Sequence, residues 1–345
     1  MPQPNLVSLV TEKRSISVIG AGIVGLWQAL ILARAGHDVC LLEVSPEARP
    51  FAGGSSRYAG AMLAPGCEAE SAPPLVRDLG WEALALWRGL YPGLVTNGSL
   101  VVAAPRERGE LRRFAKVTEG HTLLDAAGLA ALEPELAQRF DAALYFADEA
   151  HMAAPDALAF LLEAVRAAGV RVSFGVDGRG VGGGGVVIDC RGRAASDRLG
   201  QLRGVRGERA IVRARDVALQ RPVRLLHPRV PLYIVPWPDH VYMIGATVIE
   251  SEDDGPMTVR SALELLGAAY AVHAGFGEGQ ILDLDAGVRP TLPDNVPRAI
   301  VTGGGQTILV NGAYRHGFLL APVLARAVCD YLSGAADDSP LLVRS

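Results

Sequence analysis

A nine-residue stretch near the N-terminus, Ser17–Gly25 (SVIGAGIVG), restricts the fold of this chain more than any other feature. An apolar run comes first, followed by glycines in the pattern G-x-G-x-x-G. A long apolar segment and a second run, Val39–Glu43, come next, and the second run ends in an acid. This order predicts a buried strand, a glycine turn, a helix and a parallel strand over about Ser15 to Val44. That is the βαβ unit that binds dinucleotides.

Each part of this unit has a physical role. Gly20 permits the tight turn, Gly22 lets the backbone approach a pyrophosphate, and Gly25 lets the helix pack closely on the strand. The pyrophosphate is expected at the positive end of a helix that starts near Ala21. Glu43 is placed to accept hydrogen bonds from a ribose hydroxyl, and its charge repels the 2′-phosphate of NADP.

Composition limits the class of protein. A chain of 345 residues can hold two domains, or one domain with a large insertion. The net charge of −4 and the scattered arginines predict no nucleic-acid partner. We expect no signal peptide and no membrane span, because the apolar run Ile23–Ala35 is too short to cross a bilayer. The four cysteines form no C-x-x-C pair, which predicts reduced thiols, no metal site and a cytoplasmic location.

Two kinds of sequence pattern occur along the rest of the chain. Helical periodicity over 75–91, 107–120, 157–168, 259–273 and 319–332 alternates with apolar strands at 98–104, 142–146, 170–174 and 186–192. Short glycine-bounded strands over 210–249 instead predict an antiparallel sheet. The glycine run Gly180–Gly185 lacks the lysine of a phosphate loop and is interpreted as a hairpin tip. We therefore predict an α/β + β fold, in which a Rossmann-type domain is interleaved with an antiparallel-sheet domain.

Several ordered motifs resemble one known family. The chain is similar to the FAD-dependent amine oxidases of the D-amino-acid oxidase and sarcosine oxidase type, and most to the glycine oxidases of thiamine biosynthesis. The resemblance covers about Ser15 to Leu332. The motifs that carry it are the glycine turn with Glu43, Gly54–Arg57 leading to Ala61–Leu63, Asp189–Gly192, Tyr233–Pro236 with Gly245–Thr247, Gly287–Pro290 and Asn311–Gly317.

The resemblance implies a division into two discontinuous domains. Residues 15–80, 140–205 and 285–335 would bind FAD, and residues 81–139 and 206–284 would bind the substrate. FAD would be held without a covalent bond, since the small-residue segment supplies no His or Cys for attachment. The residues that the resemblance assigns to FAD are Gly20, Ala21, Gly22, Ile23, Val24, Gly25, Glu43, Ser55, Ser56, Arg57, Ala59, Gly60, Ala61, Met62, Val176, Cys190, Gly192, Arg315, His316, Gly317 and Phe318.

The same resemblance implies the substrate contacts. Arg289, which follows a strand and precedes a proline, matches the family's carboxylate-binding arginine; a guanidinium can bind a carboxylate through two parallel hydrogen bonds. Tyr233 would add a further bond to that carboxylate, and Arg315 would lie near the site entrance. No side chain is required as a base, because catalysis rests on orientation and electrostatics. His227 and His240 are accordingly interpreted as structural, as is His316.

The implied reaction is oxidative deamination of a small amino acid. Hydride would pass from the substrate Cα to flavin N5, dioxygen would reoxidise the flavin to give hydrogen peroxide, and the imine would supply the thiazole of thiamine or hydrolyse to glyoxylate. Glycine is the expected substrate, with sarcosine and small D-amino acids beside it. Two alternatives stay open, a D-amino-acid dehydrogenase with a non-oxygen acceptor and a non-catalytic flavin-binding subunit. A homo-oligomer is equally open.

Overall fold

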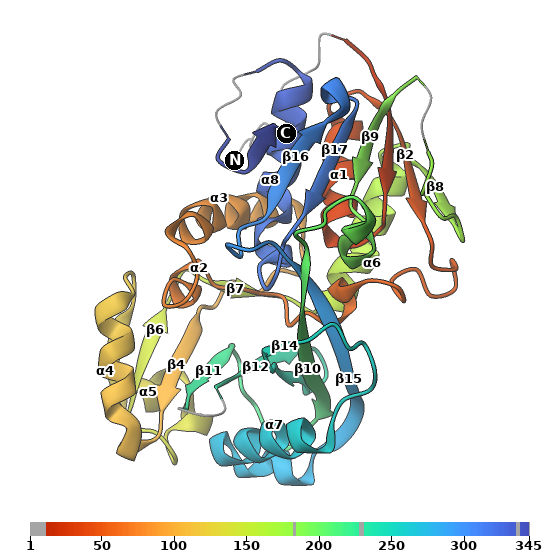
Figure 1. Ribbon diagram of the computed structural model, residues 1–345. Helices are drawn as coiled ribbons and strands as arrows, with labels where there is room; N and C mark the ends of the chain where they lie inside the picture. Colours follow the sequence, from red (N-terminus) through yellow and green to blue (C-terminus); the bar gives the residue numbers. More distant parts are fainter. Residues whose placement is uncertain (1–11, 182–183, 228–230, 336–338, 345) are drawn as a thin grey trace.

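Two large β-sheets form the framework of the molecule, one in the upper and one in the lower half of Figure 1. The computed structural model describes residues 12–181, 184–227, 231–335 and 339–344. The expected hairpin tip Gly180–Gly185 falls partly outside these ranges. A two-stranded sheet of β3 (Met62–Leu63) and β7 (Ala150–His151) lies between the large sheets (Figure 1).

The upper sheet is the predicted Rossmann-type sheet. Its strand order is β18-β16-β17-β9-β1-β2-β8, and β1 pairs in parallel with both β2 and β9. Only β16 and β17 run antiparallel to each other among its described pairs. Its strands are β1 (Ser15–Ile19), β2 (Asp38–Glu43), β8 (Arg171–Phe174), β9 (Val186–Asp189), β16 (Arg298–Thr302), β17 (Thr307–Asn311) and β18 (Leu342–Arg344).

Four helices belong to this half of the molecule: α1 (Ile23–Arg34), α3 (Pro74–Leu90), α6 (Ala154–Ala167) and α8 (Gly317–Leu332). Helix α1 is apolar on every side, and Trp27 and Leu30 have no exposed surface. A helix that is hydrophobic all round must be covered on all sides. Here α1 packs against β1, α6 and α8, which explains why its sequence resembles a membrane segment without being one.

The lower sheet has nine strands and is largely antiparallel. Its order is β14-β10-β13-β12-β11-β4-β6-β5, with β15 paired to β10. The exception is the parallel pair β4–β11. The strands are β4 (Ser99–Ala103), β5 (Thr122–Asp125), β6 (Ala142–Phe146), β10 (Arg203–Arg213), β11 (Val223–Leu226), β12 (Leu232–Trp237), β13 (Val241–Gly245), β14 (Ile249–Glu250) and β15 (Gln280–Thr291). Helices α2 (Pro65–Glu68), α4 (Arg108–Val117), α5 (Ala126–Leu132) and α7 (Val259–Val272) complete this half.

The structure lengthens two strands and adds two. β10 begins at Arg203, where only 210–212 was expected, because the buried charges of Arg206 and Glu208 neutralise each other across a 2.7 Å ion pair. β15 includes Arg289, which was expected after a strand. β5 was missed, because it is an exposed edge strand with little apolar signal. β7 was not predicted as a strand, because two residues are too few to show an alternation of apolar and polar side chains.

The α/β + β fold class is confirmed: a mixed, mainly parallel sheet and a largely antiparallel sheet. Sheet membership shifts the expected domain boundaries, however. β6 belongs to the lower sheet, whereas α3 packs against α8 of the upper half. β10 and β15 extend from the lower sheet up to the junction between the halves (Figure 1). We propose that 142–146 and 285–291 belong with the substrate-binding segments, and that α3 belongs with the FAD-binding ones.

Candidate active site

The glycine turn after β1 leaves no space for side chains. Gly20 has φ +96°, and a Cβ atom there would lie 2.7 Å from the carbonyl oxygen of Cys190. A Cβ atom on Gly25 would overlap the carbonyl oxygen of Gly20. Helix α1 can therefore approach the end of β1 only because both positions are glycine.

Polar groups surround the start of α1. The Glu43 carboxylate at the end of β2 accepts from the Ala21 N–H at 2.6 Å and from the Ser45 N–H at 2.8 Å. Ser56 Oγ accepts from the Ile23 N–H at 3.0 Å. The helix begins at Ile23 and not near Ala21, because Gly22 is still extended.

A second helix N-terminus lies beside the first. Helix α8 begins at Gly317, where an added Cβ atom would contact Ile23 of α1 at 3.4 Å. Phe318 is buried, and its carbonyl oxygen accepts from the Trp87 indole at 2.7 Å. Both helices therefore direct positive dipole ends toward the same region, which favours a ligand with negative charge there.

Other residues assigned to the cofactor have neighbours in both halves of the molecule. The N–H of Val176 donates to the Glu43 carbonyl at 3.0 Å. The carbonyl oxygen of Gly192 accepts from Asn311 Nδ2 at 2.8 Å. The small-residue segment runs against the lower sheet, since a Cβ atom on Gly60 would overlap the Met243 side chain.

Arg57 belongs to the small-residue segment, but its side chain contacts the lower sheet. Its guanidinium lies over the Tyr58 ring and pairs with Asp285 of β15 at 3.2 Å. The structure thus gives Arg57 a role in joining the segment to the lower sheet. Ser55, Ser56, Ala59, Ala61 and Met62 belong to the same continuous segment, with Ser55–Tyr58 forming a single 3-10 turn.

These features fit FAD. The glycine turn would let a pyrophosphate lie close to the backbone, and two helix N-termini point toward that region. Glu43 lies at the strand end where proteins of this fold bind a ribose. The two sets that would hold the cofactor are the β1–α1 turn with Glu43 and the segments at Ser55–Met62 and Arg315–Phe318. When bound, FAD supplies a two-electron acceptor.

Arg289, the first of the predicted substrate residues, lies on β15. Its guanidinium lies over Gly207 of the paired strand β10, where any side chain would collide with it. Arg289 Nη1 donates to the carbonyl oxygen of Thr247 at 3.2 Å. Burial, together with the nearby charge of Arg315, lowers the pKa of Arg289 to about 10, so the side chain remains a cation near neutral pH. Among the described residues, no carboxylate forms an ion pair with it.

Three buried arginines in the lower half differ from the half-buried Arg289 in this respect. Arg206 pairs with Glu208 at 2.7 Å, Arg221 pairs with Glu133 at 2.8 Å, and Arg224 pairs with Glu70 at 2.9 Å. A buried cation without a partner is costly. Arg289 could therefore bind an anion that the described residues do not supply.

Arg315, the second predicted arginine, already has a carboxylate partner. Its Nη2 lies 3.2 Å from Glu68 Oε1 and donates to the Tyr233 hydroxyl at 3.0 Å. The Tyr233 hydroxyl in turn donates to the same Glu68 oxygen at 2.6 Å. Burial opposes ionisation of Glu68, but the charge of Arg315 outweighs it. His316, which is charged only in the acid range where Glu68 titrates, adds to this effect, and the pKa of Glu68 falls to about 2.

The structure thus brings the three predicted substrate residues to the junction of the two halves, and it adds Glu68. Glu68, which follows the small-residue segment within the short helix α2, was not predicted from the sequence. Its partners are 165 and 247 residues away in the chain, so no spacing could reveal them. The only local signal was an acid placed soon after a cofactor-lining segment. Tyr233, predicted to bind the substrate carboxylate, donates its hydroxyl hydrogen to Glu68.

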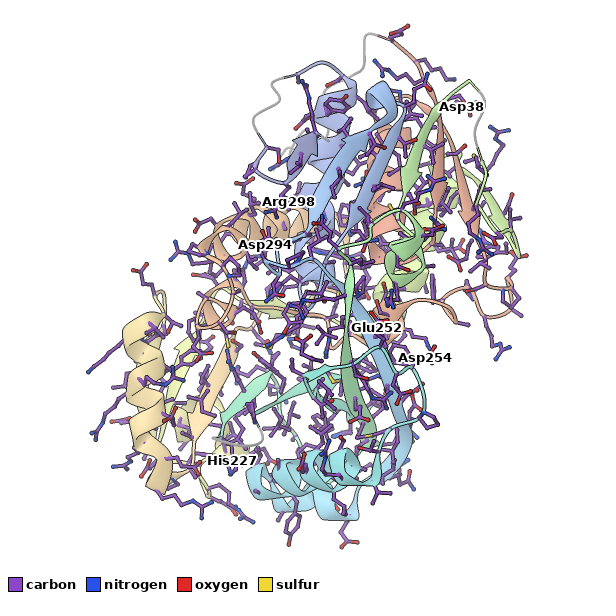
Figure 2. All side chains as sticks on the ribbon, viewed as in Figure 1. Asp38, His227, Glu252, Asp254, Asp294 and Arg298 are labelled. Atoms are coloured by element: carbon purple, nitrogen blue, oxygen red, sulfur yellow. The ribbon has the colours of Figure 1, made fainter. Side chains whose placement is uncertain are left out.

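The histidines have other surroundings. His316 is buried at the start of α8, and burial, with Arg315 nearby, lowers its pKa to about 4, so the ring is neutral at pH 7. His240 Nδ1 lies 2.9 Å from the Val217 carbonyl oxygen. His227 lies at the outer end of the lower sheet, away from the junction (Figure 2).

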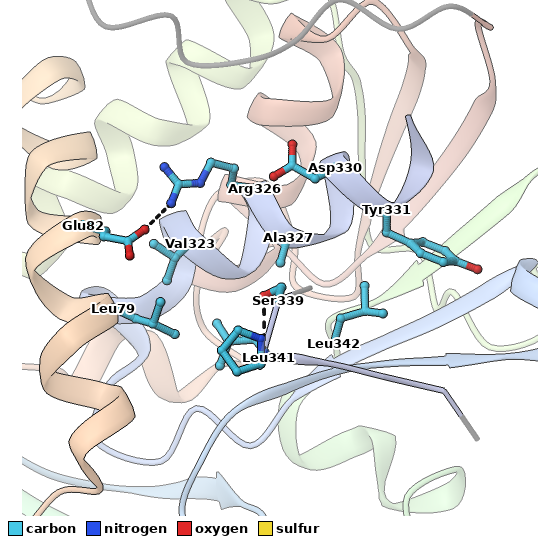
Figure 3. Close-up of a pocket in the computed structure, with 11 residues that line it drawn as sticks. Leu79, Glu82, Val323, Arg326, Ala327, Asp330, Tyr331, Ser339, Leu341 and Leu342 are labelled. Atoms are coloured by element: carbon cyan, nitrogen blue, oxygen red, sulfur yellow. Dashed lines mark hydrogen bonds and ion pairs between the residues drawn. The ribbon is translucent and has the colours of Figure 1, made fainter. Parts of the chain in front are cut away.

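A separate cavity of about 260 Å³ lies between α3, α8 and the C-terminal segment (Figure 3). Leu79, Val323 and Leu341 are among the residues that line it, and no predicted site residue does. In the described ranges, no cluster of three or more potential metal ligands occurs. No helix in those ranges is long and apolar enough to cross a membrane.

A Rossmann-type cradle joined to a second, largely antiparallel sheet is the arrangement of a flavin-dependent oxidoreductase. The chain belongs to the FAD dependent oxidoreductase family, whose model matches residues 15–331. It is 50% identical over 314 residues to "Putative thiamine biosynthesis oxidoreductase ThiO" of Rhizobium etli, covering 91% of this chain and 94% of that protein.

Two further relatives show how far the likeness extends. The bifunctional protein ThiO/ThiG of Trichormus variabilis is 25% identical over 378 residues; the match covers 95% of this chain and 54% of that protein, so this chain spans about half of it. The crystal structure of glycine oxidase from Geobacillus kaustophilus has a TM-score of 0.78 with 24% identity, and covers 96% of this chain and 97% of that one. The latter supports the fold.

Proposed function

We propose that this protein is an FAD-dependent oxidase that oxidatively deaminates glycine, and with it small amines or D-amino acids such as sarcosine. The observation that carries this proposal is the cation of Arg289, which has no carboxylate partner among the described residues and lies at the junction between the cofactor cradle and the substrate sheet. An amino-acid carboxylate is the anion that a guanidinium binds with two parallel hydrogen bonds.

Arg289 would fix the carboxylate and thereby the direction of the substrate Cα. Its own position is rigid, because the strand pair β10–β15 holds its backbone and Gly207 supports its guanidinium from below. The β1–α1 turn with Glu43 and the segments at Ser55–Met62 and Arg315–Phe318 would hold FAD without a covalent bond. FAD would supply the two-electron acceptor for the substrate hydride, with dioxygen as the final acceptor. The chain's own contribution is then orientation and charge, with no side chain required as a base.

Thiamine biosynthesis is the proposed pathway, supported by the name of the Rhizobium etli relative. The imine of glycine would supply the thiazole ring. We also propose a cytoplasmic setting, which agrees with four cysteines that are all unpaired.

The experiment is anaerobic reduction of the purified holoenzyme. Glycine should bleach the flavin absorbance, and admission of dioxygen should restore it with formation of hydrogen peroxide. If D-alanine or D-proline bleaches the flavin while glycine leaves it oxidised, glycine is not the substrate. If dioxygen fails to restore the absorbance while a quinone restores it, the protein is a dehydrogenase. A flavin that no amino acid bleaches would indicate a non-catalytic subunit.

A further inference from the structure

Glu68 has an unusual position for an acid. It lies in the four-residue helix α2, only 13% of its side chain is exposed, and it is part of the same site as Arg289. A hydrogen bond fixes the backbone next to Glu68: the N–H of Cys67 donates to the buried Glu149 carboxyl group at 2.7 Å. Such anchoring restricts Glu68 to one place.

One oxygen of Glu68 carries all its described hydrogen bonds. Oε1 receives both Tyr233 and Arg315. Oε2 is buried and has no hydrogen-bond partner among the described residues. An ionised carboxylate with a vacant acceptor attracts N–H groups and repels a second carboxylate.

The charges around the site can be summed from these pairs. Arg315 and Glu68 neutralise each other, as do Arg224 and Glu70 beside them. Arg289 remains as a single uncompensated cation. The site therefore matches a ligand with one carboxylate and leaves a second carboxylate without a cation to bind.

We propose that Glu68 makes the site selective for ligands with one negative charge, by neutralising Arg315 and repelling a second carboxylate. This inference rests on the proposed role of Arg289 as the carboxylate anchor. It adds a specificity residue, and it restricts the substrate class to amino acids whose side chain or N-substituent carries no negative charge. Exclusion by an opposing charge is a common way to reject a related ligand.

The test compares two ligands of nearly equal size that cannot be oxidised at an amine-bearing carbon. Malonate carries two negative charges at about pH 8, and its monoamide, malonamate, carries one. Binding to the holoenzyme is followed by the change in flavin absorbance. The variants are Glu68→Gln, the double variant Glu68→Gln/Arg315→Gln, and Glu250→Gln, which removes one charge from an exposed pair with Arg203 and so controls for net charge.

We expect the wild type and the Glu250→Gln control to bind malonamate about tenfold more tightly than malonate. Glu68→Gln should improve malonate binding relative to malonamate by about tenfold or more, because Arg315 becomes free, and the double variant should lose that gain. Wild-type protein that binds malonate as tightly as malonamate overturns the proposal, even if Glu68→Gln fails to fold. If folded Glu68→Gln binds malonate and malonamate with the same affinity ratio as the wild type, the proposal is overturned as well.

The result is separable from the proposed function, because no oxidation is measured. Charge selection without glycine turnover would leave Glu68 in its role and remove glycine as substrate. Glycine turnover without charge selection would leave glycine as the substrate and remove the proposed role of Glu68.

Discussion

The cofactor cradle and the arginine site were assembled by different physical means. The cradle is a contiguous piece of chain. Gly20 and Gly25 let backbone segments lie close together, and the pairing of β1 with β2 places Glu43. The arginine site consists of Arg289 with Glu68, Tyr233 and Arg315, which come from four separate segments. The first depends on the absence of side chains, and the second on the balance of buried charges. Substitutions should therefore damage them in different ways.

The largest effect is expected in the cradle. Gly25→Ala would force a methyl group into the Gly20 carbonyl, separate α1 from β1, lower the free energy of unfolding by about 3 kcal/mol and abolish FAD binding. Urea unfolding and the flavin content of the purified protein measure this. Gly109→Ala is the control: nothing lies near its Cβ position in α4, so stability should rise by about 0.5–1 kcal/mol. Retention of FAD by Gly25→Ala would show that the turn is not tightly packed.

In the arginine site, Arg289→Ala should act on substrate and not on the cofactor. Loss of a charge-assisted bidentate contact should raise the apparent KM for glycine on the order of 100-fold, with FAD content unchanged. Steady-state peroxide formation gives the KM. Arg326→Ala, which removes an arginine whose side chain is 39% exposed and paired with Glu82, should leave the KM unaltered. An unaltered KM in Arg289→Ala would remove that residue from the site.

The support beneath the arginine site should respond to pH. Burial raises the pKa of Glu149 from 4.5 to about 8. The folded protein therefore holds a proton that the unfolded chain releases, and wild-type stability falls as pH rises from about 4.5 to 8. Glu149→Gln lacks this loss, so its stability relative to wild type should increase across that range by more than about 1 kcal/mol.

Urea unfolding at a series of pH values measures the difference for Glu149→Gln. Glu163→Gln, which changes an exposed acid of α6 paired with Arg166, serves as the control and should show no trend. A flat difference in Glu149→Gln would mean that the Glu149 carboxylate is already ionised in the folded protein.

The smallest effect concerns a single hydroxyl. Tyr233→Phe removes the bonds to Glu68 and Arg315 and should raise the apparent KM about fivefold, equivalent to about 1 kcal/mol. Tyr242→Phe removes a bond to the Val217 carbonyl in the core of the lower sheet. It should lower stability by a similar amount and leave the KM unchanged. Equal KM values in the two variants would place Tyr233 outside the site.

The sequence predicted the cradle well because its chemistry is local. Gly20 and Gly25 each need a neighbour only a few residues away or on the adjacent strand, and the periodicity of β1, α1 and β2 places Glu43 without knowledge of the rest. The structure corrected only the start of α1.

The arginine site was predictable only in part. Arg289, Arg315 and Tyr233 came from resemblance, and no pattern indicated that Arg315 was already neutralised. Glu68 and Glu149 were missed because buried acids become recognisable only once the fold brings their partners together. The first part of the long strand β10 was missed for the same reason, since its paired charges obscure a strand pattern.

The central claim is that Arg289 is free to bind the substrate carboxylate, whereas Arg315 is already paired with Glu68. A crystal structure of the holoenzyme with acetate tests it most directly. We predict that the acetate carboxylate lies within about 2.7–3.2 Å of the Arg289 guanidinium, while Arg315 stays on Glu68. Acetate bound to Arg315 with Glu68 displaced, and no anion at Arg289, would contradict the account.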